Sequence, residues 1–266
     1  MALTVSYDGT DFAGSQRQAN GRTVQQELEG ALGRVFGDGA TTVFAGRTDR
    51  GVHAAGQVVG CEDRRPGWTE TALMAVVNAH LPDDVAVTAL ARRPPEFHAR
   101  FDARWREYRY RLWSGPPQPT VRRFVWRRTA ALEIGAMTEA LAPLLGRHDF
   151  ASFAGSGRGV PWSDRSAGGR GTVRTILAAR CAEAVPWWGP QGGGTLIEVT
   201  VVADGFLPQM VRSLVGALVE VGRGAREPTW LGEVLAARDR RRGAPTAAPH
   251  GLTLWRVGYG DERPAP

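Results

Sequence analysis

The order of secondary-structure patterns in the first 92 residues is the strongest constraint on the fold. Alternating apolar residues predict strands, and apolar residues at helical spacing predict helices. The elements expected are strand 2–7, helix 23–36, strand 41–45, strand 57–61, helix 69–81 and strand 85–92. Thr23 and Gln26 have the spacing of a capping box at the start of the first helix. This order is that of a ferredoxin-like unit, a topology shared by RNA-recognition modules.

A second α+β half follows the turn marked by Pro94 and Pro95. The run FDARWREYRYRLW alternates as a strand in which Arg106 and Tyr108 share one face. Further elements are expected as helices near 135–145, 206–221 and 230–239, and strands near 173–181, 195–203 and 252–259. We therefore predict an α+β protein with two ferredoxin-like or RRM-like halves, residues 1–103 and 104–266, built on mainly antiparallel sheets.

The charge of the chain points to an anionic partner. The 33 basic residues exceed the 27 acidic ones, giving a net charge of +6, and every basic residue is Arg. Arg offers a planar fork of donors that suits phosphate and can stack on bases. A coding bias toward GC-rich codons accounts for the absence of Lys. Only the net positive charge is therefore taken to indicate an anionic partner.

Several classes of protein are excluded by what the sequence lacks. Cys61 and Cys181 cannot build a disulfide framework and match no metal-ligand spacing. The N-terminal residues lack the pattern of a signal peptide, and no run approaches the roughly 20 apolar residues that span a bilayer. No nucleotide-binding glycine loop or metal motif is present. We expect a cytoplasmic protein that needs neither a metal nor a small-molecule cofactor and does not enter a membrane.

The segment AGRTDRGVHAAGQVV contains the main candidates for catalytic residues. Asp49 lies there in a polar turn that leaves an apolar strand. An Asp in a turn is usually an acceptor for nearby backbone N–H groups, and that reading remains open. Arg47, Arg50 and His53 crowd the same glycine-bounded loop, however, and these groups would keep the carboxylate ionised as a nucleophile.

This loop resembles the signature of TruA-type tRNA pseudouridine synthases. Other blocks of that family follow in order as YDGTDFAG, TVQQELEGAL, NAHLPDDVAV, FHARFDARWREYRYRL, HDFASF, GFLPQMVRSLVGALVEVG and TAAPHGLTL. The resemblance implies an RNA-modifying isomerase that flips a base and converts uridine to pseudouridine at positions 38, 39 and 40 of the tRNA anticodon stem-loop. It also implies a homodimer in which one tRNA touches both subunits, and a basic catalytic cleft between the two sheets of the fold.

The resemblance assigns roles to individual residues. Asp49 matches the nucleophile, Tyr108 the tyrosine that stacks on the target base, and Arg212 the basic residue that pairs with the nucleophile. An Arg in an apolar helix is costly to bury unpaired, so the sequence itself asks for an acidic partner of Arg212. Arg47 matches the residue that replaces the flipped nucleotide; a simple phosphate contact is the alternative, as a core aromatic is for Tyr108. The candidates for substrate binding are Arg47, Arg50, His53, Gln57, Arg106 and Tyr108.

Three departures from the family pattern leave the RNA substrate open. Ser15 stands where the family usually has Trp, Arg50 replaces a customary Ala, and Pro208 and Gln209 replace Tyr-His or His-His. A specialised paralogue acting on another RNA therefore remains an alternative. A catalytically silent RNA-binding protein and a carboxylate-dependent hydrolase of free nucleosides are two others. Binding without product would favour the silent protein, and release of free uracil would favour the hydrolase.

Overall fold

The structure, a computed structural model, describes residues 1–155, 171–189 and 193–262. The described chain divides into two compact units. The first comprises Met1–Arg106 together with the segment that begins at Thr253, and the second comprises Glu107–Leu252. The unit boundaries fall inside strand β5 (Ala103–Ser114) and at the start of strand β10 (Leu252–Tyr259).

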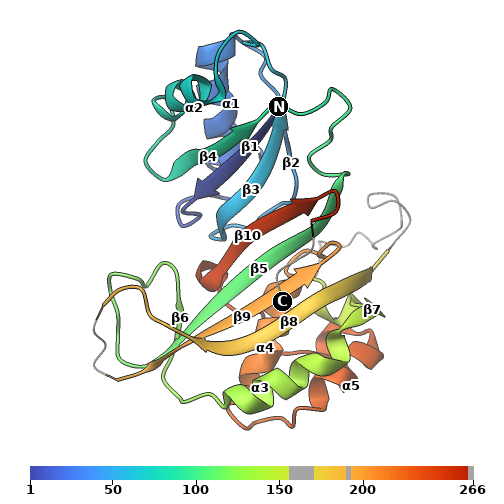
Figure 1. Ribbon diagram of the computed structural model, residues 1–266. Helices are drawn as coiled ribbons and strands as arrows, with labels where there is room; N and C mark the ends of the chain where they lie inside the picture. Colours follow the sequence, from blue (N-terminus) through green and yellow to red (C-terminus); the bar gives the residue numbers. More distant parts are fainter. Residues whose placement is uncertain (156–170, 190–192, 263–266) are drawn as a thin grey trace. The chain divides into compact units, whose positions relative to one another are not determined.

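The first unit is built on a sheet whose strands run in the order β4-β1-β3-β10, with β2 also paired to β3 (Figure 1). Its other strands are β1 (Ala2–Tyr7), β2 (Thr42–Phe44), β3 (His53–Cys61) and β4 (Val85–Ala91). β1 pairs antiparallel with both β3 and β4. β10 runs parallel to β3, with Thr253 opposite His53. The strands predicted within the first 92 residues are confirmed, and β3 begins earlier than expected.

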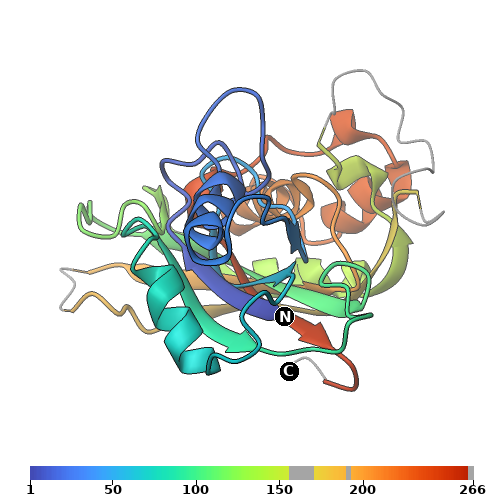
Figure 2. The ribbon, with the colours of Figure 1, turned by 90° about the horizontal axis from the view of Figure 1, so that it is seen from above.

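Two helices cover this sheet, α1 (Val24–Phe36) and α2 (Glu70–Asn78). Thr23 caps α1 in the predicted capping box, with both of its hydrogen bonds present. The apolar face of α1 is buried, including Leu28 and Leu32, which are fully covered. α1 and α2 contact each other and β4, as Figures 1 and 2 show. Burial of this face, at roughly 25 cal/mol per Å² of apolar surface, is what fixes the helices to the sheet.

The second unit contains the strand order β5-β9-β8-β7, with β6 paired to β5. Its strands other than β5 are β6 (Trp126–Arg128), β7 (Gly146–Asp149), β8 (Val173–Ala184) and β9 (Thr195–Ala203). β8 pairs antiparallel with β7 and β9, whereas β6 is parallel to β5. β8 and β9 match the predicted strands, while the short strands β6 and β7 were not predicted.

The helices of the second unit contact one another, and α3 packs against β8 (Figure 1). They are α3 (Ile134–Leu141), α4 (Met210–Gly222) and α5 (Trp230–Ala237), with single 3-10 turns at Ala142–Leu144, Ala151–Phe153, Arg240–Arg242 and Pro249–Gly251. α4 is buried on almost every side. A Cβ atom at Gly216 would lie 2.0 Å from the carbonyl oxygen of Pro245, so only glycine allows this close approach. The segment after Pro245 is thereby held against α4.

The described residues form a mixed α/β fold whose strand pairs are mostly antiparallel. Among the helices in the described ranges, none combines the length and apolar character needed to cross a membrane.

Candidate active site

Asp49 lies in the loop between β2 and β3, in the first unit. Its backbone forms an isolated antiparallel bridge with Gly14, and its carbonyl accepts the N–H of Val52 at 3.1 Å. The side chain is half-buried, between the buried Thr48 and the exposed Arg50. The carboxylate is thus presented from a tight turn whose backbone is anchored to a second segment of the chain.

Two buried side chains hold the backbone just before Asp49. Gln57, which is fully buried, donates from Nε2 to the Gly46 carbonyl at 2.8 Å and accepts the Gly46 N–H at 3.3 Å. Ser15 Oγ accepts the N–H of Thr48 at 2.9 Å, while the N–H of Ser15 donates to the Thr48 carbonyl at 3.1 Å. These contacts satisfy four backbone hydrogen-bonding groups of the loop and tie it to Ser15 and Gln57.

Strand β1 and the YDGT segment at its end also contact this loop. Tyr7 OH lies 2.8 Å from Thr48 Oγ1, and burial raises the pKa of Tyr7 to about 12. Tyr7 therefore keeps its proton at a higher pH than an exposed tyrosine would. A Cβ atom at Gly9 would lie 2.0 Å from the Val52 carbonyl oxygen, so the YDGT segment packs directly on the loop. His53 Nδ1 accepts the N–H of Gly9 at 3.0 Å and joins the two segments.

Three arginines lie in or beside the loop. Arg47 and Arg50 are exposed. Partial burial and the neighbouring Arg100 guanidinium lower the pKa of Arg47. Arg106 donates to three carbonyl oxygens, those of Ala45 at 2.9 Å, Arg100 at 2.7 Å and Ala103 at 3.0 Å. Arg106 therefore connects the start of the loop to the segment before β5.

The second unit contains the other two predicted catalytic residues. Tyr108 lies on β5, is 7% exposed, and packs edge-on against Phe206 with ring centroids 4.9 Å apart. Arg212 lies in the first turn of α4, where its Nε donates to the Ala247 carbonyl at 2.9 Å. The N–H of Ala247 donates in return to the Arg212 carbonyl at 3.0 Å. Within this unit, Phe206 places the ring of Tyr108 beside the segment that leads into α4.

The predicted site residues thus fall into two groups. Those in and around the Asp49 loop belong to the first unit, namely Arg47, Asp49, Arg50, His53, Gln57 and Arg106. Tyr108 and Arg212 belong to the second unit. Sequence reasoning missed the supporting roles of Tyr7 and Ser15, and the only signal for Ser15 was its departure from the family pattern. Within the described ranges, no three His, Cys, Asp or Glu side chains gather as a metal site.

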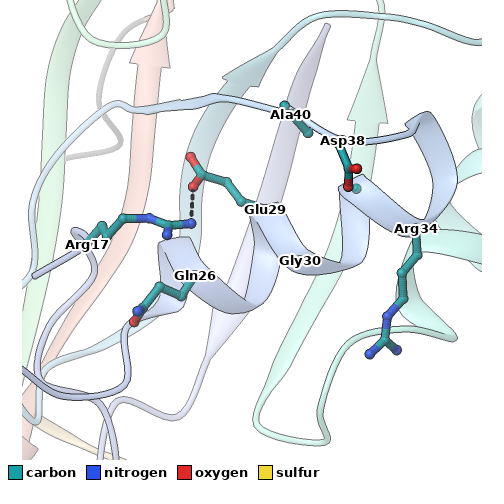
Figure 3. A pocket seen from close by; sticks show the side chains of 9 residues that line it. Arg17, Gln26, Glu29, Gly30, Arg34, Asp38 and Ala40 are labelled. Carbon is teal, nitrogen blue, oxygen red and sulfur yellow. Dashed lines mark hydrogen bonds and ion pairs between the residues drawn. The ribbon is translucent and has the colours of Figure 1, made fainter. Parts of the chain in front are cut away.

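Two surface hollows in the first unit lie away from these residues. One, of about 650 Å³, runs along α1 (Figure 3). Arg17 points toward Glu29 there and forms an ion pair of 2.7 Å, while Arg34 lies in the last turn of α1 and Asp38 follows the end of the helix. The other, of about 480 Å³, is lined by strand residues and by Arg93 and Arg256. Since none of the predicted site residues lines either hollow, the Asp49 loop is a surface feature distinct from both.

Comparisons with known proteins identify the family. The family model described as tRNA pseudouridine synthase matches residues 3–102 and 140–260. A protein of Chloroflexus aurantiacus named tRNA pseudouridine synthase A is 43% identical over 260 residues, which cover 97% of this chain and 88% of the relative. Proteins of the same name from Syntrophotalea carbinolica and Nitratidesulfovibrio vulgaris are 40% and 43% identical, over 97% of this chain and 96% and 99% of the relatives. The chain therefore belongs to the tRNA pseudouridine synthase family.

Proposed function

We propose that Asp49 is the catalytic nucleophile with which this member of the tRNA pseudouridine synthase family converts uridine to pseudouridine in tRNA. The observation that supports this assignment best is the loop that holds Asp49, whose backbone is fixed by Ser15 and Gln57. A nucleophile that is fixed before the substrate arrives lowers the barrier because little ordering remains to be done in the reaction. The isomerisation breaks the N-glycosidic bond, rotates the uracil and rejoins it through carbon. It involves no net redox change, so side chains alone can carry it.

The two predicted residues of the second unit complete the chemistry in this proposal. Tyr108 stacks on the flipped base and Arg212 pairs with the Asp49 carboxylate. Arg47 fills the gap that the flipped nucleotide leaves, as base-flipping enzymes require. The exposure of Arg47 and the fixed ring of Tyr108 against Phe206 support these roles.

The remaining candidates divide by exposure. Arg50 is exposed and is proposed to bind a phosphate of the RNA. His53 and Gln57 are buried, and the Arg106 guanidinium donates to backbone carbonyl oxygens. We therefore assign these three to substrate binding through the loop that they position.

The finer architecture also belongs to this proposal. Residues 1–103 and 104–266 are proposed to act as two ferredoxin-like halves, with β10 of the second half joining the sheet of the first. The first half supplies the nucleophile loop, and the second completes the active site across a basic cleft. The protein works in the cytoplasm as a homodimer on uridines 38, 39 and 40. The family resemblance supports this arrangement, and the net charge of +6 favours an anionic partner such as tRNA. Sedimentation tests the dimer, and a structure with RNA in which Asp49 and Tyr108 contact separate nucleotides would contradict the shared site.

The deciding experiment is pseudouridine mapping in unmodified tRNA transcripts. The native protein is compared with Asp49→Asn and Asp49→Ala, and Asp38→Asn serves as a control because Asp38 is an exposed carboxylate in the same unit. We expect product in the anticodon arm that disappears in both Asp49 variants while tRNA binding and the control remain unchanged. Product that survives in Asp49→Ala would refute the nucleophile. Modification only of another RNA would favour a specialised paralogue, and binding without any product would favour a silent RNA-binding protein.

A further inference from the structure

An exposed aromatic side chain lies in the turn between β4 and β5. We call residues 98–102 the aromatic turn. Phe101 is 75% exposed, compared with 41% for Trp68 and 51% for Trp187. The His98 ring stacks on Phe101 with centroids 4.2 Å apart and planes inclined by 28°. The Arg100 guanidinium lies 5.7 Å from the centroid of the same ring. His98 covers one face of the Phe101 ring, and most of the remaining surface of Phe101 faces solvent.

The exposure of Phe101 does not come from a loosely held chain. His98 Nδ1 accepts the N–H groups of Arg100 at 3.2 Å and Phe101 at 3.1 Å, which fixes the imidazole within its own turn. The N–H of His98 donates to Asp102 Oδ2 at 2.8 Å, and the N–H of Asp102 donates to the His98 carbonyl at 3.1 Å. The turn is therefore closed at both ends. A rigid aromatic surface binds a flat ligand with little loss of conformational entropy.

The aromatic turn is connected to the Asp49 loop. Arg106 donates to the Arg100 carbonyl at 2.7 Å and to the Ala45 carbonyl, at the start of the loop, at 2.9 Å. Arg100 is also near enough to Arg47 to lower its pKa. Both guanidinium groups are exposed, and that of Arg100 lies beside the Phe101 ring. Placing like charges together is unfavourable without an anion, so this arrangement suits a phosphate.

We propose that Phe101, backed by His98, is a stacking platform for an unpaired nucleobase of the RNA substrate, with Arg100 binding the adjoining phosphate. Aromatic rings that stack bases, together with cations that follow the backbone, are the usual means of binding single-stranded nucleic acid. An apolar protein partner would instead require a wider apolar surface than one ring among arginines. The inference rests on the proposed function, because it takes the ligand to be the RNA that reaches Asp49.

The test compares Phe101→Ala, Phe101→Leu and Phe101→Tyr in the full-length protein. The equilibrium Kd for an unmodified tRNA transcript and the thermal unfolding midpoint are measured for each. Stacking of one base predicts that Ala and Leu weaken binding about 5- to 150-fold, whereas Tyr stays within about twofold of the native protein. The unfolding midpoint should not change, because Phe101 is mostly exposed. Trp68→Ala, which removes another exposed aromatic side chain of the same unit, is expected to leave Kd unchanged.

Three results would overturn the platform. An unchanged Kd in Phe101→Ala would remove the base contact. Full affinity in Phe101→Leu would mean that an apolar contact is sufficient and that no base stacks there. A change of sedimentation in Phe101→Ala without a change in Kd would assign the ring to a contact between copies of this chain. Failure of the proposed function would instead be visible in the native protein, as a lack of pseudouridine in any tRNA.

Discussion

Ser15 provides the most direct residue-scale test of how the nucleophile is positioned. Its hydroxyl accepts the N–H of Thr48, the residue before Asp49, and it is 1% exposed. In Ser15→Ala the buried N–H loses its partner, which costs about 1–3 kcal/mol. A small displacement of a nucleophile can lower a rate about 100-fold, so we expect the single-turnover rate constant to fall about 10- to 100-fold. The Kd for tRNA should not change, since RNA cannot reach Ser15.

The matched control for this variant is Thr23→Ala. Thr23 is also a buried hydroxyl residue of the first unit, but it caps α1 and makes no contact with the Asp49 loop among its hydrogen bonds. Loss of the cap should cost about 1 kcal/mol of folding free energy with an unchanged rate constant. Ser15→Thr keeps the hydroxyl and should recover part of the rate. Equal rate constants in Ser15→Ala and the native protein would reduce Ser15 to a structural residue.

Tyr7 gives a prediction for the pH dependence of stability. Burial raises its pKa from 10.0 to about 12 in the folded state. The folded protein therefore retains a proton that the unfolded chain releases, and the stability linked to it is present below pH 10 and is lost as the pH rises toward 12. Two pKa units correspond to about 3 kcal/mol. Between pH 10 and 12, Tyr7→Phe should lose about that much less stability than the native protein in urea titrations; parallel losses would contradict the assignment.

At the scale of elements, local patterns predicted more than long-range pairing did. α1 was expected with its cap because Thr23, Gln26 and the apolar face all lie within a few turns of one another. The parallel pairing of β10 with β3 places Thr253 opposite His53. These residues are far apart in the sequence, so no local pattern predicts that they pair. β6 and β7 have three and four residues, which is too short for alternation to be recognised.

The same contrast holds for the candidate site. The Asp49 loop was recognisable because its charged residues are close together in the sequence. Its supports were not, because Tyr7 and Ser15 are 41 and 33 residues from Thr48. A hydroxyl in a loop carries no mark that it will be buried against a distant backbone N–H. Phe101 was equally hidden, since an aromatic residue next to a strand is expected in the core.

At the scale of the whole molecule, the question is whether tRNA affinity follows net charge or the position of charge. The chain carries +6, spread over many arginines. In Arg47→Gln/Arg100→Gln we expect the plot of log K against log salt concentration to become shallower by about 2, because both arginines are proposed to contact the RNA and each lost cationic contact removes about one released counterion. Filter binding of one tRNA transcript across a series of salt concentrations measures this slope.

Arg17→Gln/Arg34→Gln separates the two explanations, because it removes the same formal charge from the hollow along α1 (Figure 3). If net charge governed binding, both double variants would weaken tRNA affinity and reduce the salt slope equally. If the arginines beside the Asp49 loop make the contacts, the α1 variant should keep the native slope, because only cations that contact the RNA release counterions on binding. Equal slopes in the two double variants would therefore argue against RNA contacts at Arg47 and Arg100, while the stacking test of Phe101 stays independent.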